Sequence, residues 1–137
     1  MKPARSVRIL AVIGIAFGVL TIASGARALF GDAAARAAVG NAVPYVLWFN
    51  FLAGFVYVAA GIGLWRTQRW AVALAAMLAV ATAAIATAFG LHVLEGGAYE
   101  MRTVGALALR FGFWAIVGVV AWRNLARQAT GTRSAIG

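Results

Sequence analysis

The sequence contains no cysteine, a single histidine and only three acidic residues among 137. Without a thiol, the chain cannot form a disulfide, carry out thiol redox chemistry or hold a metal through thiolates. Charged residues make up 11% of the chain, whereas about a quarter of the residues in a soluble globular protein are charged. The composition therefore argues against a soluble domain.

What the sequence does contain is four long apolar stretches, at about residues 7–29, 44–65, 70–91 and 103–122. A bilayer core about 30 Å thick needs roughly 20 apolar residues at 1.5 Å each. We therefore predict an all-α integral membrane protein, a bundle of four transmembrane helices. The loops are too short for a second core, so residues 1–137 are predicted to form one domain.

The basic residues predict the orientation of the bundle. Arg27, Arg36 and Arg102 share one side with all three acids, and eight basic residues and no acid lie on the other side: Lys2, Arg5, Arg8, Arg66, Arg69, Arg123, Arg127 and Arg133. Because basic residues flanking the spans stay in the cytoplasm, both termini are predicted to be cytoplasmic, in a bacterial-type plasma (inner) membrane. The same placement argues that the net charge of +9 serves topology and lipid contact rather than nucleic-acid binding.

The N-terminal segment also has features of a signal peptide. Basic residues within 2–8, the apolar run 9–25 and the triplet Ala26-Arg27-Ala28 resemble a signal sequence with its cleavage site. The apolar run is long for a signal peptide, and an arginine inside the cleavage site is unusual. We therefore expect an uncleaved first helix.

Small residues recur at helical spacing and predict where the helices touch. In lipid, helices associate by close packing, which small residues permit. Span 70–91 is alanine-rich on nearly every face, so it is expected to be the most closely surrounded helix. The other spans carry seams that include Val7, Ala11, Gly14, Gly18, Thr21 and Gly25, then Asn50, Gly54, Tyr57 and Gly61, and finally Gly105, Ala108, Gly112 and Ala115.

The first outer loop has the signals of a short helix. Asp32 can cap it, the alanine-rich run 33–39 favours helix, and Gly40 can end it. We predict a short helix lying at the outer membrane surface.

Polar residues gather in one layer on the outer side, and this layer is where a ligand site would lie. Asn50 is about 9 Å deep and Arg110 about 10 Å deep at 1.5 Å per residue. The inner halves of the spans are almost wholly apolar apart from Tyr57. The candidate ligand or network residues are Asn50, Thr87, His92, Glu95, Glu100, Arg102 and Arg110.

Arg110 is the clearest functional candidate, since an ionisable residue inside a membrane is costly. It can reach the headgroups without any further role, because side chains lean toward the N-terminus of their helix. Alternatively it pairs with Glu100 or Glu95, or grips a partner subunit. It projects away from the small residues Ala108 and Gly112, so either it faces lipid or the last span has two protein contacts.

His92, Glu95 and Glu100 offer nitrogen and oxygen atoms that could hold a metal ion. The signal is weak, and the sequence requires no cofactor. No serine, histidine and aspartate set has a catalytic spacing, so we expect no enzyme activity.

Two functional classes remain. The first is a non-catalytic accessory or structural subunit that docks on a larger membrane complex, favoured by the short loops and the bulky side of span 44–65. The second is a small homo-oligomeric transporter, or a ligand- or metal-binding protein, that uses the outward-facing polar layer. In both classes the expected partners are the lipid bilayer and either another protein or a second copy of this chain.

Overall fold

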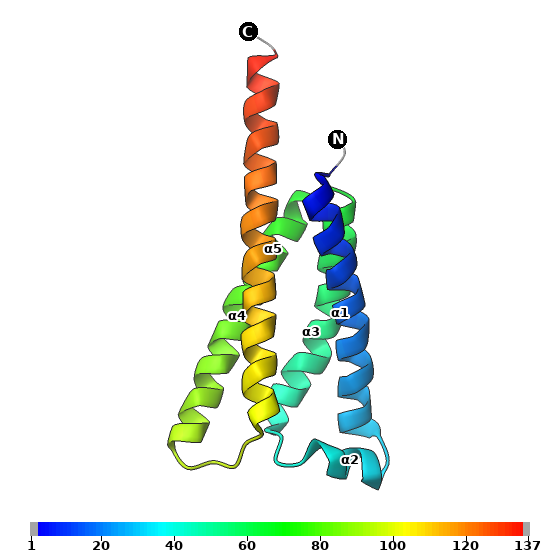
Figure 1. The fold of residues 1–137 in the computed structure, drawn as a ribbon, viewed down its shortest axis with the longest axis vertical. Coiled ribbons are helices and arrows are strands. Elements are labelled where there is room, and N and C mark those ends of the chain that lie inside the picture. Colours follow the sequence, from blue (N-terminus) through cyan, green and yellow to red (C-terminus); the bar gives the residue numbers. More distant parts are fainter. Residues whose placement is uncertain (1–2, 136–137) are drawn as a thin grey trace.

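A computed structural model describes residues 3–135, and this part of the chain is all helical. Its five helices are α1 (Arg5–Phe30), α2 (Ala33–Val39), α3 (Pro44–Trp65), α4 (Arg69–Leu94) and α5 (Met101–Ser134). All but α2 are long and apolar enough to cross a membrane. Figure 1 shows the N-terminal end of α1 and the C-terminal end of α5 at one end of the molecule, and α2 at the other, which we call the α2 end.

The predicted apolar stretches lie inside these helices, and two helices extend well beyond them. The bounds of α3 coincide with the predicted span. The helix α4 continues about one turn past its predicted end, to Leu94, and so includes His92. The helix α5 continues to Ser134, and its C-terminal end projects past the rest of the bundle (Figure 1). Hydropathy identifies only the apolar part of a helix, so it does not detect a polar continuation such as this one.

The helices α1 and α3 make the most extensive contact in the bundle. The residues that α1 buries are the predicted seam: Val7, Ala11, Gly14, Gly18, Thr21 and Gly25. On α3, Gly54 lies against Gly18 and Ile22, and Gly61 lies against Ala11 and Ile15. Without side chains at these glycines, the two backbones approach closely enough for dispersion contacts to hold the pair together in lipid.

The helix α5 presents large residues to the bundle, in contrast to the small seam that the sequence suggested. Its buried residues are Leu107, Trp114, Val117 and Ala121. A Cβ added at Gly105 or Gly112 would meet no atom within 4 Å, so Gly112 marks no helix contact within residues 3–135. The buried face of α5 therefore consists mainly of large side chains, and Ala121 is its one small residue among those described.

The alanine-rich helix α4 is not the most closely surrounded helix, which corrects our expectation. More of α3 than of α4 is buried, and α4 leans away from α3 toward the α2 end and packs mainly on α5 (Figure 1). Small residues permit close contact on every face, but lipid exerts no hydrophobic force that would drive such contact.

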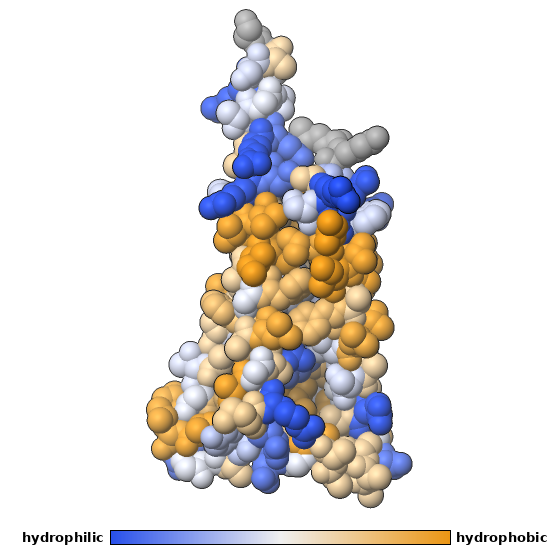
Figure 2. Space-filling view, viewed as in Figure 1, coloured by the Kyte–Doolittle hydropathy of each residue, from blue (hydrophilic) through white to orange (hydrophobic). Residues whose placement is uncertain are grey.

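The short helix α2 forms as predicted and lies across the end of the bundle (Figure 1). The Asp32 carboxylate accepts a hydrogen bond from the Ala35 N–H at 2.8 Å, and Gly40 ends the helix with a positive φ of 66°. On the face seen in Figure 2, apolar residues form a band across the middle, and most polar residues lie toward the two ends. The surface thus agrees with a multi-pass membrane protein.

Candidate functional site: a cavity at the α2 end

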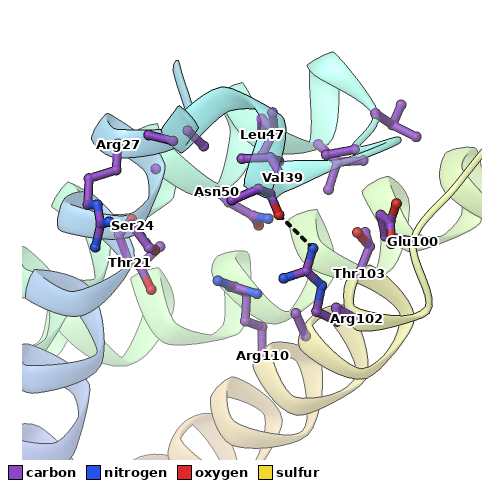
Figure 3. A pocket seen from close by; sticks show the side chains of 18 residues that line it. Thr21, Ser24, Arg27, Val39, Leu47, Asn50, Glu100, Arg102, Thr103 and Arg110 are labelled. Atoms are coloured by element: carbon purple, nitrogen blue, oxygen red, sulfur yellow. Dashed lines mark hydrogen bonds between the residues drawn. The ribbon is translucent and has the colours of Figure 1, made fainter. Parts of the chain in front are cut away.

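A cavity of about 450 Å³ lies at the α2 end, between α1, α2, α3 and α5. This volume is in the range of small-molecule sites, which is about 300–1,000 Å³. Apolar lining comes mainly from alanines and from Val39, Val43, Val46 and Leu47. Figure 3 shows the polar lining residues, which are Thr21, Ser24, Arg27, Asn50, Glu100, Arg102, Thr103 and Arg110.

The wall that α1 supplies is a row of polar residues at three-residue spacing. Thr21, Ser24 and Arg27 lie on successive turns of one helical face. Thr21 is buried, and the Ser24 hydroxyl donates to its carbonyl at 3.2 Å. Arg27 is exposed in the last turn of α1, where a cation complements the helix dipole.

Two hydrogen bonds fasten the α2 segment over the first turn of α5. The Arg102 Nη2 donates to the carbonyl of Ala38 at 3.0 Å, which is the dashed line in Figure 3. The Glu100 Oε1 accepts from the backbone N–H of Asn41 at 2.8 Å. The only lining carboxylate is therefore engaged by the loop after α2, and Arg102 satisfies a carbonyl at the end of that helix.

Arg110 and Asn50 extend the cavity toward the interior of the bundle. The Arg110 guanidinium lies over the ring of Phe17, with 5.5 Å from Cζ to the ring centroid. The buried Arg110 Nε and the buried Asn50 Oδ1 make no hydrogen bond with any of residues 3–135. Arg110 thus faces the bundle, and neither carboxylate proposed as its partner pairs with it in the part of the chain described.

A cluster of three side chains with polar atoms lies in the core next to Arg110. Tyr57, Thr82 and Trp114 are fully buried, and the Tyr57 hydroxyl lies near Arg110, Thr82 and Trp114. The Thr82 hydroxyl donates to the carbonyl of Leu78 at 2.7 Å. The Tyr57 hydroxyl and the Trp114 Nε1 form no hydrogen bond of good geometry within residues 3–135. Polar side chains are therefore found next to the cavity lining, in the core of the bundle.

The charges of the cavity favour an anionic ligand. Three lining residues are arginines, and one is an acid. A guanidinium presents N–H donors in a planar fork that matches carboxylate and phosphate oxygens, and it holds its charge at any physiological pH. Such a lining offers hydrogen-bond donors that can hold a carboxylate or a phosphate group.

The structure brings four of the seven candidate residues together and leaves three outside the cavity. Asn50, Glu100, Arg102 and Arg110 line it. The Thr87 hydroxyl donates to the carbonyl of Ala83 at 2.9 Å on its own helix. His92 Nε2 lies 3.0 Å from the carbonyl of Ala98, and Glu95 is an exposed residue at the end of α4. The candidate residues therefore fall into two groups, because α4 packs mainly on α5 and leans away from the cavity.

Metal binding gains no support from this geometry. Over residues 3–135, no group of three or more His, Cys, Asp or Glu side chains is placed to hold a metal ion. His92 and Glu95 lie at the end of α4, whereas Glu100 turns to Asn41 across the α2 end. The three weak candidates for a metal site thus lie apart.

Sequence reasoning missed Arg27 as a site residue and Trp114 as a core residue. Both could have been found from helical spacing. Arg27 follows Thr21 and Ser24 on the same face of α1, and Trp114 lies one turn after Arg110. In the sequence prediction Arg27 served only as a charge that indicates orientation, and Trp114 was given no role.

Comparison of this chain with protein families, with curated proteins and with solved structures gave no match.

Proposed function

We propose that this protein is a small, non-catalytic membrane protein that binds a ligand in the cavity at the α2 end. In this proposal the α2 end faces outward from a bacterial-type plasma membrane, and both termini are cytoplasmic. The orientation rests on the eight basic residues that flank the spans on the termini side, with no acid among them.

One observation supports the binding function above all. The cavity is large enough for a small molecule, and its lining residues include Arg110 and Asn50, whose buried Nε and Oδ1 have no partners from residues 3–135. Buried polar atoms without a partner cost about 1–3 kcal/mol each. A bound ligand would offset this cost, because it would supply the missing hydrogen-bond partners.

The other end of the bundle favours binding over transport. The buried residues toward the termini end include the apolar Val7, Ala11, Leu64, Ala71 and Ala121. The polar residues Thr67, Gln68, Asn124 and Gln128 line only a small pocket there, of about 20 Å³. A passage for a polar ligand would need hydrogen-bonding groups there, because unpaired polar groups are costly in an apolar medium. We therefore infer that a polar ligand has access to the cavity from the α2 end only.

The test is whether a small molecule co-purifies with the full chain and leaves when the cavity is filled. Ala106→Phe puts a ring into the lining, while Ala108→Phe puts the same ring on the exposed face of α5. Native mass spectrometry in a mild detergent should show a bound mass on the wild type and on Ala108→Phe, and none on Ala106→Phe. The same spectra give the oligomeric state. Equal ligand content in both variants would refute binding in this cavity.

An accessory subunit of a larger complex is the second candidate, and the extension of α5 favours it. Residues 123–134 continue the helix beyond the predicted span and carry Arg123, Arg127 and Arg133. From Ala126 to Ala135 they are exposed except for Gln128. Deleting residues 126–137 should then abolish co-purification of unlike subunits while ligand content is unchanged. Purification without unlike subunits from the native membrane would remove this candidate.

A further inference from the structure

We propose that the ligand of the cavity carries a phosphate group, held by Arg102 and Arg110. This inference rests on the proposed function, since it names the chemistry that the same cavity would recognise. The group would belong either to a phospholipid headgroup or to a free phosphate, and the experiment below separates these two sources.

The first argument is charge. Arg27, Arg102 and Arg110 line one cavity with Glu100 as the only acid, and the Glu100 carboxylate is hydrogen-bonded to the N–H of Asn41. Guanidinium groups that share a cavity repel one another, more strongly as water is excluded. A phosphate group brings one or two negative charges and several acceptor oxygens, so it compensates two arginines at once.

The second argument is the supply of donors. Arg110 keeps its buried Nε free of partners from residues 3–135, and Arg102 uses one Nη2 donor for the carbonyl of Ala38. The remaining donors of both residues are available for oxygen atoms. The first turn of α5 starts at Met101 beside the lining residue Thr103, so the positive end of the helix dipole lies at this cavity.

The third argument is position and the nature of the remaining lining. The cavity lies beneath α2, at the end of the apolar band where lipid headgroups would be found (Figures 2 and 3). Val39, Val43, Val46 and Leu47 add apolar surface, which suits the glycerol ester region of a lipid. The unpartnered Asn50 Oδ1 suits a hydroxyl donor of the headgroup.

The experiment measures thermal stability of the full chain in dodecyl maltoside, a detergent without phosphate. One arm adds dioleoyl phosphatidylglycerol, and its control adds dioleoylglycerol, which has the same acyl chains and no phosphate. Another arm adds sodium phosphate, against sodium chloride at equal ionic strength. The variants are Arg110→Gln and Ala106→Phe, with Arg36→Gln as the matched control, since Arg36 is exposed on α2 and does not line the cavity.

We expect a dose-dependent rise of the melting temperature with one of the two phosphate sources and none with its control. Arg110→Gln should weaken the apparent affinity at least about tenfold, as expected for a lost hydrogen bond to a charged group. Ala106→Phe should abolish the effect, and Arg36→Gln should change it less than about twofold. A response to phosphatidylglycerol alone assigns a lipid, and a response to inorganic phosphate assigns a free anion.

Two results would overturn the inference. One is a response that survives both Arg110→Gln and Ala106→Phe, because it would be attraction to the charged surface. The other is no response to either source. If a molecule still co-purifies and is lost in Ala106→Phe, then the phosphate inference alone is wrong. If nothing co-purifies, then the proposed ligand-binding function is wrong as well.

Discussion

The carbonyl oxygen of Gly54 lies 2.8 Å from the position that a Cβ on Gly18 would occupy, and the carbonyl of Gly18 lies 3.1 Å from the Cβ position on Gly54. These two glycines let α1 and α3 meet backbone to backbone. The contact positions the wall of the cavity that carries Thr21 and Ser24, because these residues follow Gly18 by one to two turns.

Substituting either glycine should separate α1 from α3. We expect Gly18→Ala and Gly54→Ala each to cost about 1–3 kcal/mol of unfolding free energy, because the added methyl group overlaps backbone atoms. Gly112→Ala is the matched control, since its Cβ would meet nothing within 4 Å. It should be neutral or stabilise by about 0.4–1 kcal/mol. Denaturant unfolding in detergent measures the unfolding free energy of each variant. Equal losses of unfolding free energy in Gly18→Ala and Gly112→Ala would contradict this packing.

Gly40 should be harder to replace than Gly96, although both have a positive φ. Their φ angles are 66° and 84°, so alanine is strained at each by about 1–3 kcal/mol. A Cβ at Gly40 would also strike the Glu100 carboxylate, whereas one at Gly96 would meet nothing within 4 Å. Gly40→Ala should therefore cost more stability and speed hydrogen exchange at the Asn41 amide. Faster exchange at Asn41 in Gly96→Ala would speak against this explanation.

Arg110→Leu should leave the ligand-free protein as stable as the wild type, or more stable by up to about 3 kcal/mol. The half-buried guanidinium has no carboxylate partner in residues 3–135, and an apolar residue costs less in a membrane. A double-mutant cycle with Glu100→Gln should give a coupling energy below about 0.5 kcal/mol, the value for independent sites. A larger coupling would show that the two residues pair after all.

The lack of native cysteine allows the orientation to be tested with single cysteines. Ala34 on α2 and Thr132 on α5 are exposed and lie at opposite ends of the molecule. A membrane-impermeant maleimide should label Ala34→Cys in intact cells, and Thr132→Cys only after permeabilisation. The reverse pattern would invert the orientation and put the cavity on the cytoplasmic side.

His92 should prove to be a structural residue. Its Nε2 lies 3.0 Å from the carbonyl of Ala98 and fastens the loop after α4. We expect His92→Ala to cost about 0.5–1.5 kcal/mol, the usual net value of one hydrogen bond. Added Zn²⁺ should leave the melting temperature of the wild type unchanged. A Zn²⁺-dependent rise that His92→Ala abolishes would restore the metal hypothesis.

The helices and one of their interfaces could be predicted from the sequence alone. Hydropathy over about 20 residues marks a span because backbone groups in lipid must be paired within a helix. The seam from Val7 to Gly25 could be found because small residues at spacings of three and four have one obvious use in a membrane. Asp32 and Gly40 bounded α2, since capping is a local interaction.

Two features could not be predicted without the packing of the helices: the face of α5 that meets the bundle, and the set of polar residues that share a cavity. In lipid an apolar side chain is satisfied on either side of a helix, so the pattern of Leu107, Trp114 and Gly112 does not reveal the buried face. The lean of α4 carries His92 and Glu95 away, while Asn50 and Arg110 meet residues from α1 and α2. Depth along a helix can be counted from sequence, but the direction of a residue around the bundle depends on how all the helices pack.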